Sequence, residues 1–598
     1  MTPEGPESRI RRRTPAVVGP LAACIFLVAL LGAGAAHAQI AAPPRPLIGD
    51  PTGRSSEPPP LYEELPRTLP EPGLLLPPIP PPPPREQGVL PRIAVFVREI
   101  RVVGNTVFTK QQISAITAPY TNREVTAEDL EALRVALTLL YVNAGYVNSG
   151  AVLPDQTVAD GVVTYRIVEG SLKSIDIEGN RWLRASYYKD RLSLAAGPPL
   201  DVNSLQQRLQ LLLEDPRIER LNAQLKPGIA PGEAALDVRV QERFPLRLWL
   251  DFDNYQAPSV GAERLIATVA HQSLTGHADV LSLSYGRSQG LNPLLDFSYA
   301  IPVTAYDTTL FAQYRRNDFT VVEAPFDPLD IQSDSEVYTV GIRQPVYRTP
   351  STIVSLELSG DRESLDTSLL GVPFSLEPGA VNGQTVVTVV RFAQEFVYRT
   401  RSQVIAARSR FSFGLDALGS TINSDDLPDS QFVAWLGQFQ WVRQFDELKP
   451  FGVPGTQIIF RADAQLASKP LLTLEQIALG GRYTVRGYPQ NTLVRDNAFI
   501  TSVEARLPIV RNTPFAQYLE LAPFFDYARG WNTDRPTVGP SDLAGIGVGF
   551  RWGLTIPASV PLRSEFEFYW AQPLRDIATS ASPIQGNGLY FQLLFGIF

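Results

Sequence analysis

The sequence has little of the side-chain chemistry on which most enzymes and metal proteins depend. Its 598 residues include one Cys, one Met and three His. A single cysteine excludes a disulfide framework and a zinc site made of several thiolates. Three histidines are too few for a histidine-rich metal site or a proton relay. We therefore expect no catalytic residue, no cofactor and no metal, and the protein is not expected to be an enzyme.

Dense blocks of positive charge are also missing beyond the N-terminal segment. The chain carries 53 Lys and Arg against 61 Asp and Glu, a net charge of −8. Proteins that bind nucleic acids depend on basic patches that neutralise phosphates, so a nucleic acid is excluded as a partner. A chain of this length also exceeds what one hydrophobic core supports, and several domains are expected.

The only long apolar run lies near the N-terminus and predicts a cleaved signal peptide over residues 1–38. Arginines at positions 9 and 11–13 precede the apolar stretch 16–34, and Ala36-His37-Ala38 has the small-x-small form that signal peptidase accepts. Two alternatives are open, a lipoprotein cleavage box ending at Cys24 and a retained membrane anchor. Against them, the residues after Cys24 stay apolar, and the run is shorter than the ~20 residues of a spanning helix.

Residues 39–92 are dense in proline, most of all from Pro77 to Pro84. Proline at this density excludes helix interiors and sheet ladders. The segment is therefore interpreted as an extended, polyproline II-like linker. The alternative is a docking segment for a proline-binding groove.

An internal repeat follows the linker. The stretch from Ile100 to Asn105, IRVVGN, recurs 75 residues later as IDIEGN. Thr126 and Asp201 stand at the same offset, and both are good helix N-caps. Each precedes leucines at helical spacing, and strands such as Val162 to Val168 and Leu236 to Val240 come later. The repeat predicts two small α+β modules, over residues 93–170 and 171–243, with the helical leucines mainly in their cores.

From residue 244 to 598 the sequence alternates with a period of two. Leu246, Leu248, Leu250 and Phe252, for example, alternate with Arg247, Trp249, Asp251 and Asp253. Such strands face lipid on one side and water on the other, and about 350 residues hold roughly sixteen spanning strands with their turns. A soluble sandwich or propeller shows similar alternation, but the export signal and the terminal Phe598 favour an outer-membrane β-barrel.

The last strand leaves one question open, namely which of its faces meets lipid. Its more apolar face carries Leu589, Phe591, Leu593, Phe595 and Ile597, whereas Phe598 lies on the other face with Gln592 and Gly596.

Several motifs in order resemble the two-partner secretion transporters (TpsB; the ShlB/FhaC/HecB hemolysin secretion/activation family). In the modules these are Tyr141 to Val147, Val152 to Gln156, Val168-Glu169-Gly170 and Leu225 to Glu233; in the barrel tract they are Asp253-Asn254-Tyr255 with Gly261 and the stretch Gly480 to Tyr488. The core of the last motif, Val485-Arg486-Gly487-Tyr488, is similar to the tip of a long inward loop in this superfamily.

The resemblance implies a mainly β protein in which two α+β POTRA domains precede a transmembrane antiparallel β-barrel of about sixteen strands. Arg486 would lie on a loop folded into the barrel lumen and pair with Asp526 on the inner wall, next to Phe524 in the same strand motif. Ala528 replaces a glycine of that motif, and the proline-rich segment has no obvious counterpart of the family's plug helix. The Arg486–Asp526 pair is interpreted as a gate or as a structural clamp, and the two roles are compatible.

The implied function is an outer-membrane pore that captures an unfolded exoprotein through periplasmic POTRA domains and exports it. Candidate substrate-binding features are strand edges and the grooves beside Leu130, Leu133, Leu137, Leu205, Leu209 and Leu212. The expected partners are a secreted TpsA-type exoprotein of the hemolysin or adhesin kind, outer-membrane lipid and the barrel assembly machinery. The alternatives are a general assembly factor, which usually carries more POTRA domains, and a solute channel.

Overall fold

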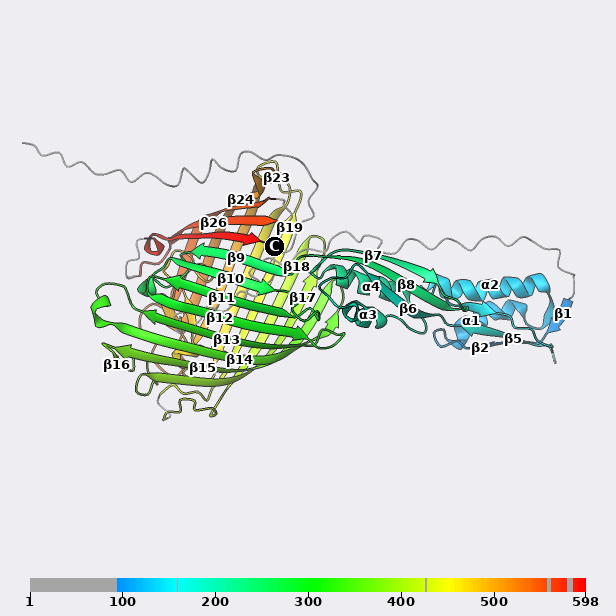
Figure 1. The fold of residues 1–598 in the computed structure, drawn as a ribbon, viewed down its shortest axis with the longest axis horizontal. Helices are drawn as coiled ribbons and strands as arrows, with labels where there is room; N and C mark the ends of the chain where they lie inside the picture. The colour runs from blue at the N-terminus through cyan, green and yellow to red at the C-terminus, as the bar shows by residue number, and fades with distance from the viewer. Residues whose placement is uncertain (1–93, 159, 425–426, 557–560, 578–583, 598) are drawn as a thin grey trace, which may run out of the picture. The chain divides into compact units, whose positions relative to one another are not determined.

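The computed structural model describes residues 94–598 except 159, 425–426, 557–560, 578–583 and 598 (Figure 1). The predicted signal peptide, the predicted proline-rich linker, Cys24 and Phe598 lie outside the described residues. No helix in the described part is long and apolar enough to cross a membrane.

The first module contains two helices and five short strands. A three-stranded sheet in the order β2-β5-β4 packs with the helices, and β1 pairs with β3 in a separate ladder. The elements are β1 (Ala94–Val97), β2 (Glu99–Val103), α1 (Lys110–Thr117), β3 (Arg123–Thr126), α2 (Ala127–Asn143), β4 (Gly150–Val152) and β5 (Val162–Val168), with a 3-10 turn at Ala118–Tyr120.

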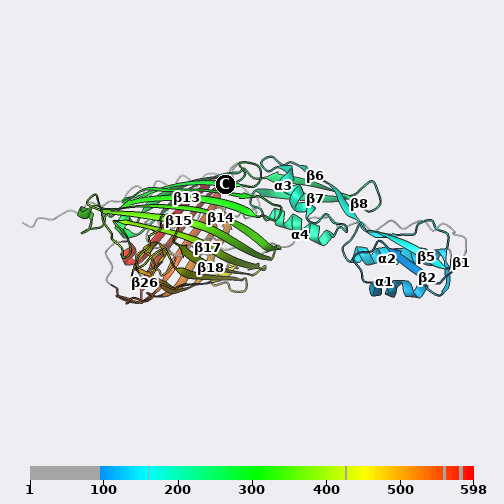
Figure 2. The same cartoon turned by 90° about the horizontal axis from the view of Figure 1, so that it is seen from below.

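The second module repeats this plan with a sheet in the order β6-β8-β7 (Figure 2). Its elements are β6 (Ser171–Glu178), α3 (Ala185–Ser193), α4 (Val202–Leu213), β7 (Ile218–Pro227) and β8 (Glu233–Glu242). The predicted caps are confirmed, because Thr126 accepts from the Asp129 amide at the start of α2 and Asp201 accepts from the Asn203 amide at the start of α4.

Both modules use the same polar contacts around the turn that follows β2 in the first module and β6 in the second. The side-chain amides of Asn105 and Asn180 each donate to the carbonyl three residues on, at 2.7 and 3.0 Å. A glutamate at or after the last strand, Glu169 or Glu242, accepts from backbone amides of that turn and from a buried tyrosine. Burial and the neighbouring glutamate raise the pKa of that tyrosine in both modules. The repeat therefore preserves these hydrogen bonds as well as the order of helices and strands.

The helical leucines lie inside the modules. Leu133, Leu137, Leu205 and Leu209 are fully buried and Leu212 nearly so, while Leu130 is half-buried against the first core. Their side chains pack between helices and sheet, so in this conformation the five buried leucines cannot contact a substrate. The prediction that the helical leucines lie mainly in the cores is confirmed, and the grooves beside these helices and the exposed strand edges stay as predicted substrate-binding features.

Sixteen long antiparallel strands close into a barrel (Figure 1). A two-residue strand, β16 (Val372–Pro373), pairs only with β15 and is not part of the closed wall. The wall strands are β9 (Leu246–Asp253), β10 (Arg264–His271), β11 (Val280–Ser288), β12 (Leu291–Pro302), β13 (Thr309–Thr320), β14 (Ile331–Arg348), β15 (Thr352–Leu369), β17 (Gln384–Arg399), β18 (Gln403–Leu415), β19 (Val433–Phe445), β20 (Thr456–Ala467), β23 (Asn497–Thr513), β24 (Ala516–Trp531), β25 (Asp542–Ile556), β26 (Leu562–Pro573) and β27 (Leu589–Ile597).

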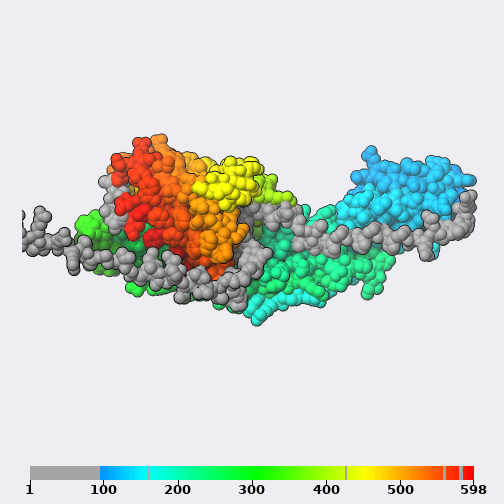
Figure 3. Space-filling model, turned by 90° about the horizontal axis from the view of Figure 1, so that it is seen from above, coloured from blue at the N-terminus to red at the C-terminus, as the bar shows by residue number. Residues whose placement is uncertain are grey.

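The two faces of the wall differ as the alternation predicts. On β9, Leu246 to Phe252 at every second position are exposed on the outside, whereas Arg247, Trp249 and Asp253 are buried inside. On β27 the outward side chains are Leu589, Phe591, Leu593, Phe595 and Ile597. The more apolar face of the last strand therefore lies on the outer surface of the barrel. Figure 3 shows the outside of the barrel where the orange and red C-terminal strands lie.

The barrel closes between its last and first strands through a short ladder. Six residue pairs join β27 to β9, from Gln592–Asp253 to Ile597–Leu248. By contrast, β14 and β15 are paired over almost their full length.

Candidate functional site

The connection between β20 and β23, residues 468–496, folds back into the barrel. It contains the 3-10 turn Thr473–Glu475 and the small hairpin of β21 (Ile477–Leu479) and β22 (Leu493–Arg495). The wall residues that it contacts alternate with exposed neighbours such as Val503, Phe525 and Trp570, so they point inward. We call this segment the lumen loop.

Arg486 lies at the centre of the lumen loop's contacts with the wall. Its Nε and Nη2 donate to the two carboxylate oxygens of Asp526 at 2.7 and 2.8 Å, and its backbone N–H also donates to Asp526 at 3.0 Å. Its Nη1 donates to Glu504 at 2.7 Å, and its guanidinium carbon lies 3.3 Å from the centre of the Phe524 ring. The structure thus brings Arg486 together with Asp526 and Phe524, and adds Glu504.

These groups are almost completely removed from solvent. Arg486 is 3% exposed and Asp526 is 1% exposed. The bidentate fork is the strongest geometry for an arginine–carboxylate pair. Removing one member of such a buried pair costs about 3–5 kcal/mol, because the other charge stays buried without a partner. We call Arg486, Asp526 and Glu504 the clasp.

The residues around Arg486 fix the loop tip to other strands. Val485 is fully buried in an apolar cluster that includes Ala528. The methyl group of Ala528, which stands where the related motif has glycine, therefore packs within this cluster. The Gly487 amide donates to the Tyr590 hydroxyl at 2.9 Å, and that hydroxyl donates to the Tyr488 carbonyl at 2.6 Å. Gly487 has a φ of 104°, which favours glycine because other residues are strained there.

A track of glycines on β25 makes room for the loop tip and for aromatic side chains of the neighbouring strands. Gly545, Gly547 and Gly549 occupy alternate positions and face the lumen. A side chain at Gly545 would place its Cβ 2.0 Å from the Arg486 carbonyl oxygen. Our sequence reasoning missed this track, although glycine at every second position of a strand is a visible signal of close backbone approach.

A second arginine of the motif, Arg482, contacts the last strands. It donates to Glu567 on β26 at 2.9 Å and lies 3.9 Å from the centre of the Tyr569 ring. Glu567 also accepts from Arg551 on β25. The contacts described so far for residues 482–488 fall on β23 to β27.

The base of the lumen loop is attached to a different part of the wall. Glu475 accepts two hydrogen bonds from Arg391 on β17, at 2.8 and 3.0 Å. Arg391 also binds Asp361 and Glu363 on β15. Sequence reasoning missed this pair, because only the register of the barrel brings residues so far apart together. We call Glu475 and Arg391 the base anchor.

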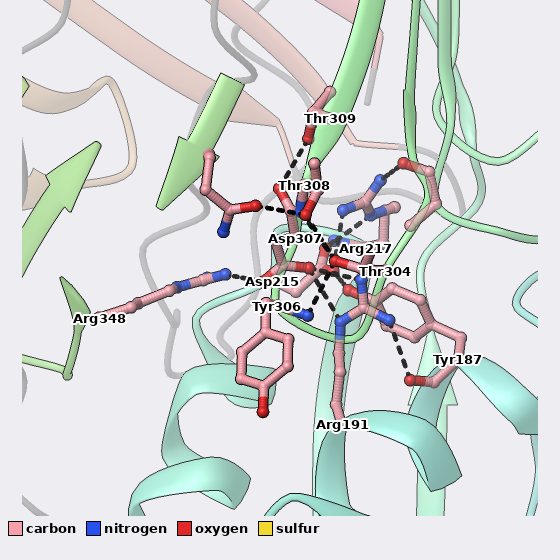
Figure 4. A network of polar contacts seen from close by, with 12 residues as sticks. Tyr187, Arg191, Asp215, Arg217, Thr304, Tyr306, Asp307, Thr308, Thr309 and Arg348 are labelled. Carbon is pink, nitrogen blue, oxygen red and sulfur yellow. Dashed lines mark hydrogen bonds and ion pairs between the residues drawn. The ribbon is translucent and has the colours of Figure 1, made fainter. Parts of the chain in front are cut away.

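A third set of ionic contacts joins the second module to the ends and turns of the barrel strands nearest to it (Figure 4). Arg191 on α3 donates from Nε to Asp307, in the turn between β12 and β13, at 3.0 Å, and Arg348 at the end of β14 contacts the same carboxylate. Arg399 at the end of β17 donates to Glu214, directly after α4, at 2.8 Å. We call these contacts the junction.

A buried polar group supports the junction from inside the module. The Tyr187 hydroxyl donates to Asp215 at 2.5 Å, and Arg217 donates to Asp215 and to the Ala278 carbonyl of the β10–β11 turn. Burial raises the pKa of Tyr187, and Asp215 adds to this. Burial also acts to raise the pKa of Asp215, but Arg217 outweighs it and holds that pKa below its ordinary value.

Two families of known proteins match the sequence. The family described as haemolysin secretion/activation protein ShlB/FhaC/HecB matches residues 232–552, and the ShlB-type POTRA domain matches residues 95–170. The outer membrane transporter CdiB of Dickeya dadantii (strain 3937) is 22% identical over 473 residues, which are 76% of this chain and 80% of that protein. The heme/hemopexin transporter protein HuxB of Haemophilus influenzae is 20% identical over 435 residues, which are 70% and 73% of the two chains.

A solved structure shows the same fold. CdiB from Escherichia coli matches with a TM-score of 0.63 at 20% identity, over 86% of this chain and 92% of that one.

Proposed function

Because the chain belongs to the haemolysin secretion/activation family ShlB/FhaC/HecB, and is therefore an outer-membrane secretion pore with periplasmic POTRA domains, we propose that it exports one dedicated exoprotein by moving its lumen loop. The proposed partner is a secreted TpsA-type protein of the hemolysin or adhesin kind. We further propose that the exposed apolar side chains on the outside of the barrel contact outer-membrane lipid. The barrel assembly machinery is proposed to insert the chain.

The observation that carries the proposal is the lumen loop itself. It is held inside the barrel at its tip by the clasp and at its base by the base anchor. An unfolded chain passing through the lumen competes for the space that this loop occupies. Export therefore requires the loop to shift, and the clasp is the contact that the shift must break.

Capture of the substrate is assigned to a free strand edge of the modules. β7 is ten residues long and, among the strands that the structure describes, pairs only with β8, so its other edge offers unpaired backbone groups to an extended peptide. A photo-crosslinking residue at the exposed Gln224 on β7 should capture the exoprotein, and one at the exposed Asp176 on the opposite edge strand β6 serves as the matched control. Equal capture at both positions would contradict the assignment to β7.

The gating role is tested by Arg486→Ala in cells that express the exoprotein. The matched control is Arg315→Ala, which removes an inner-wall arginine paired with the buried Asp296 on β12 and β13. We expect normal barrel levels and lost secretion for Arg486→Ala, and near-normal secretion for the control. Loss of the folded barrel in Arg486→Ala would show that the Arg486–Asp526 pair is a structural clamp, and it would contradict the gating proposal.

The dedicated function is tested by proteomics of the outer membrane and the medium, with and without the gene. Loss of one or two large exported proteins, with other barrels unchanged, supports the proposal. A broad fall in many barrels would show an assembly factor instead, and no change in either fraction would favour a solute channel.

A further inference from the structure

A pocket of about 460 Å³ opens where the second module meets the turn between β10 and β11. Arg181, Trp182 and Arg184 line it from the module, and His271 and Leu274 line it from the barrel. Two hydrogen bonds hold its sides together: the Ser273 hydroxyl donates to the Trp182 carbonyl at 3.1 Å, and the Arg184 amide donates to the Gly276 carbonyl at 2.9 Å.

The strand register places this pocket at the end of the lipid-facing wall. His271 is the last residue of β10 and pairs with Leu246 on β9 and Leu281 on β11. It shares its face of β10 with Leu265 and Val269, both exposed on the outside of the barrel. The outer apolar surface therefore ends at His271, and the pocket begins there on the periplasmic side.

The polar side of the pocket is positively charged. Arg181 and Arg184 are both exposed, and neither makes an ion pair with another described residue. Arg181 stacks over the Trp182 ring at 4.7 Å, and Arg184 lies 3.3 Å from His277. The nearby carboxylate of Glu242 is already occupied by the backbone amides of residues 181–183 and by the Tyr188 hydroxyl.

The apolar side of the pocket also lies at the end of the lipid-facing wall. Trp182 packs edge to face on Phe244 with ring centres 5.7 Å apart, directly before β9 begins. Leu274 is 57% exposed in the β10–β11 turn. Tryptophan with arginine beside an apolar surface is the pattern that proteins use at the headgroup level of a membrane.

We propose that this pocket binds one anionic phospholipid, with the phosphate on Arg181 and Arg184 and the glycerol and upper acyl chains along Trp182 and Leu274. The site lies outside the lumen and takes no part in export itself. A lipid held there contacts the module and the barrel turn together, so it ties the second POTRA domain to the inner surface of the membrane.

The test uses the full chain purified in detergent, with binding counted by native mass spectrometry. Short-chain phosphatidylglycerol, short-chain phosphatidylcholine and inorganic phosphate are titrated separately. We expect one tightly retained phosphatidylglycerol per chain, weaker phosphatidylcholine, and little phosphate. Arg181→Gln with Arg184→Gln should weaken the phosphatidylglycerol site by at least about tenfold, since each arginine near a membrane surface contributes measurably to the attraction of anionic lipid.

Two variants keep this test specific. Arg181→Lys with Arg184→Lys retains the charge and should retain most of the binding. Arg101→Gln with Arg166→Gln removes two exposed arginines from the first module and should change nothing. Phosphate bound as tightly as phosphatidylglycerol would overturn the lipid assignment in favour of a free-anion site. Unchanged phosphatidylglycerol binding in the Arg181 and Arg184 glutamine variant would overturn the site.

Discussion

The clasp and the junction both join another part of the chain to the barrel wall or its turns through arginine and carboxylate, but they differ in burial. In the clasp, Arg486 and Asp526 are almost fully covered, whereas at the junction Arg191, Asp307 and Arg348 are 12%, 23% and 31% exposed in their side chains. A buried ion pair has no stable intermediate in which one charge stays buried after losing its partner, because a lone buried charge is strongly unfavourable. Partly exposed pairs exchange their partner for water at little cost.

The difference suggests two kinds of movement. The lumen loop should be either held or released, with few intermediate positions. The second POTRA domain should adjust gradually, and salt should loosen it. Four predictions test this contrast.

The largest effect should come from breaking the clasp on one side. Arg486→Leu leaves Asp526 buried without its cation, whereas Glu504 keeps Arg506, and we expect the barrel to lose about 3–5 kcal/mol of stability. Arg486→Leu with Asp526→Leu removes both partners and should lose less than the single variant. Urea unfolding of the purified barrels measures both. A double variant as unstable as the sum of the two singles would show that the pair is not coupled.

The base anchor should matter less, because Arg391 keeps Asp361 and Glu363 when Glu475 is neutralised. Glu475→Gln should leave the barrel folded and raise the fraction of time that the channel is open, by up to about tenfold for a loss of roughly 1–1.5 kcal/mol. Planar-bilayer recording measures this fraction. The matched control is Glu357→Gln, whose partner Arg408 also lies on the wall. The same opening in both variants would remove the special role of the base anchor.

The interior of the junction should respond to acid. The pKa of Asp215 is lowered in the folded module, so its contribution to stability is complete above its ordinary value of 3.8 and is lost as the pH falls toward the lowered value. Asp215→Asn should therefore be less stable at neutral pH, by about 1–2 kcal/mol, and should lose less stability below about pH 4. Chemical unfolding at pH 3 to 7, followed by tryptophan fluorescence, gives both quantities. An acid limb as steep as that of the parent protein would contradict the assignment.

The smallest effect should come from the rim of the junction. Asp307→Asn removes the shared partner of Arg191 and Arg348 and should change stability by less than about 1 kcal/mol. Spin labels at the exposed Asn222 and Glu447 report the distance between the second module and the barrel. Its distribution should broaden in the variant, and 0.5 M salt should broaden it in the parent protein. A sharp distribution under all three conditions would show that packing alone holds the module.

Sequence reasoning reached the parts of the fold that local patterns determine. The caps at Thr126 and Asp201, strand β5 from Val162 to Val168, and the outward leucines of β9 were all predicted and are confirmed. The short helix α1 was not predicted, although Thr109 and Gln112 form a capping box that marks its start.

The site was only partly accessible from the sequence. Arg486 and Asp526 came from the resemblance, whereas Glu504 and the base anchor depend on which strands the closed barrel places opposite the loop. No local pattern encodes that arrangement. For the helical leucines the apolar spacing was enough to predict a core position, which the structure confirms.

The short ladder between β27 and β9 bears on the order of assembly. The clasp partners of Arg486 are Glu504 on β23 and Asp526 on β24, which are neighbouring strands of one sheet, whereas Arg482 and Tyr483 also contact Tyr255, just after β9. The clasp can therefore be complete while the sheet is still open along β9. In this order of assembly the wall closes around a lumen that already holds the loop, and the six residue pairs between β27 and β9 form last. The lumen loop is then already in place when the barrel closes.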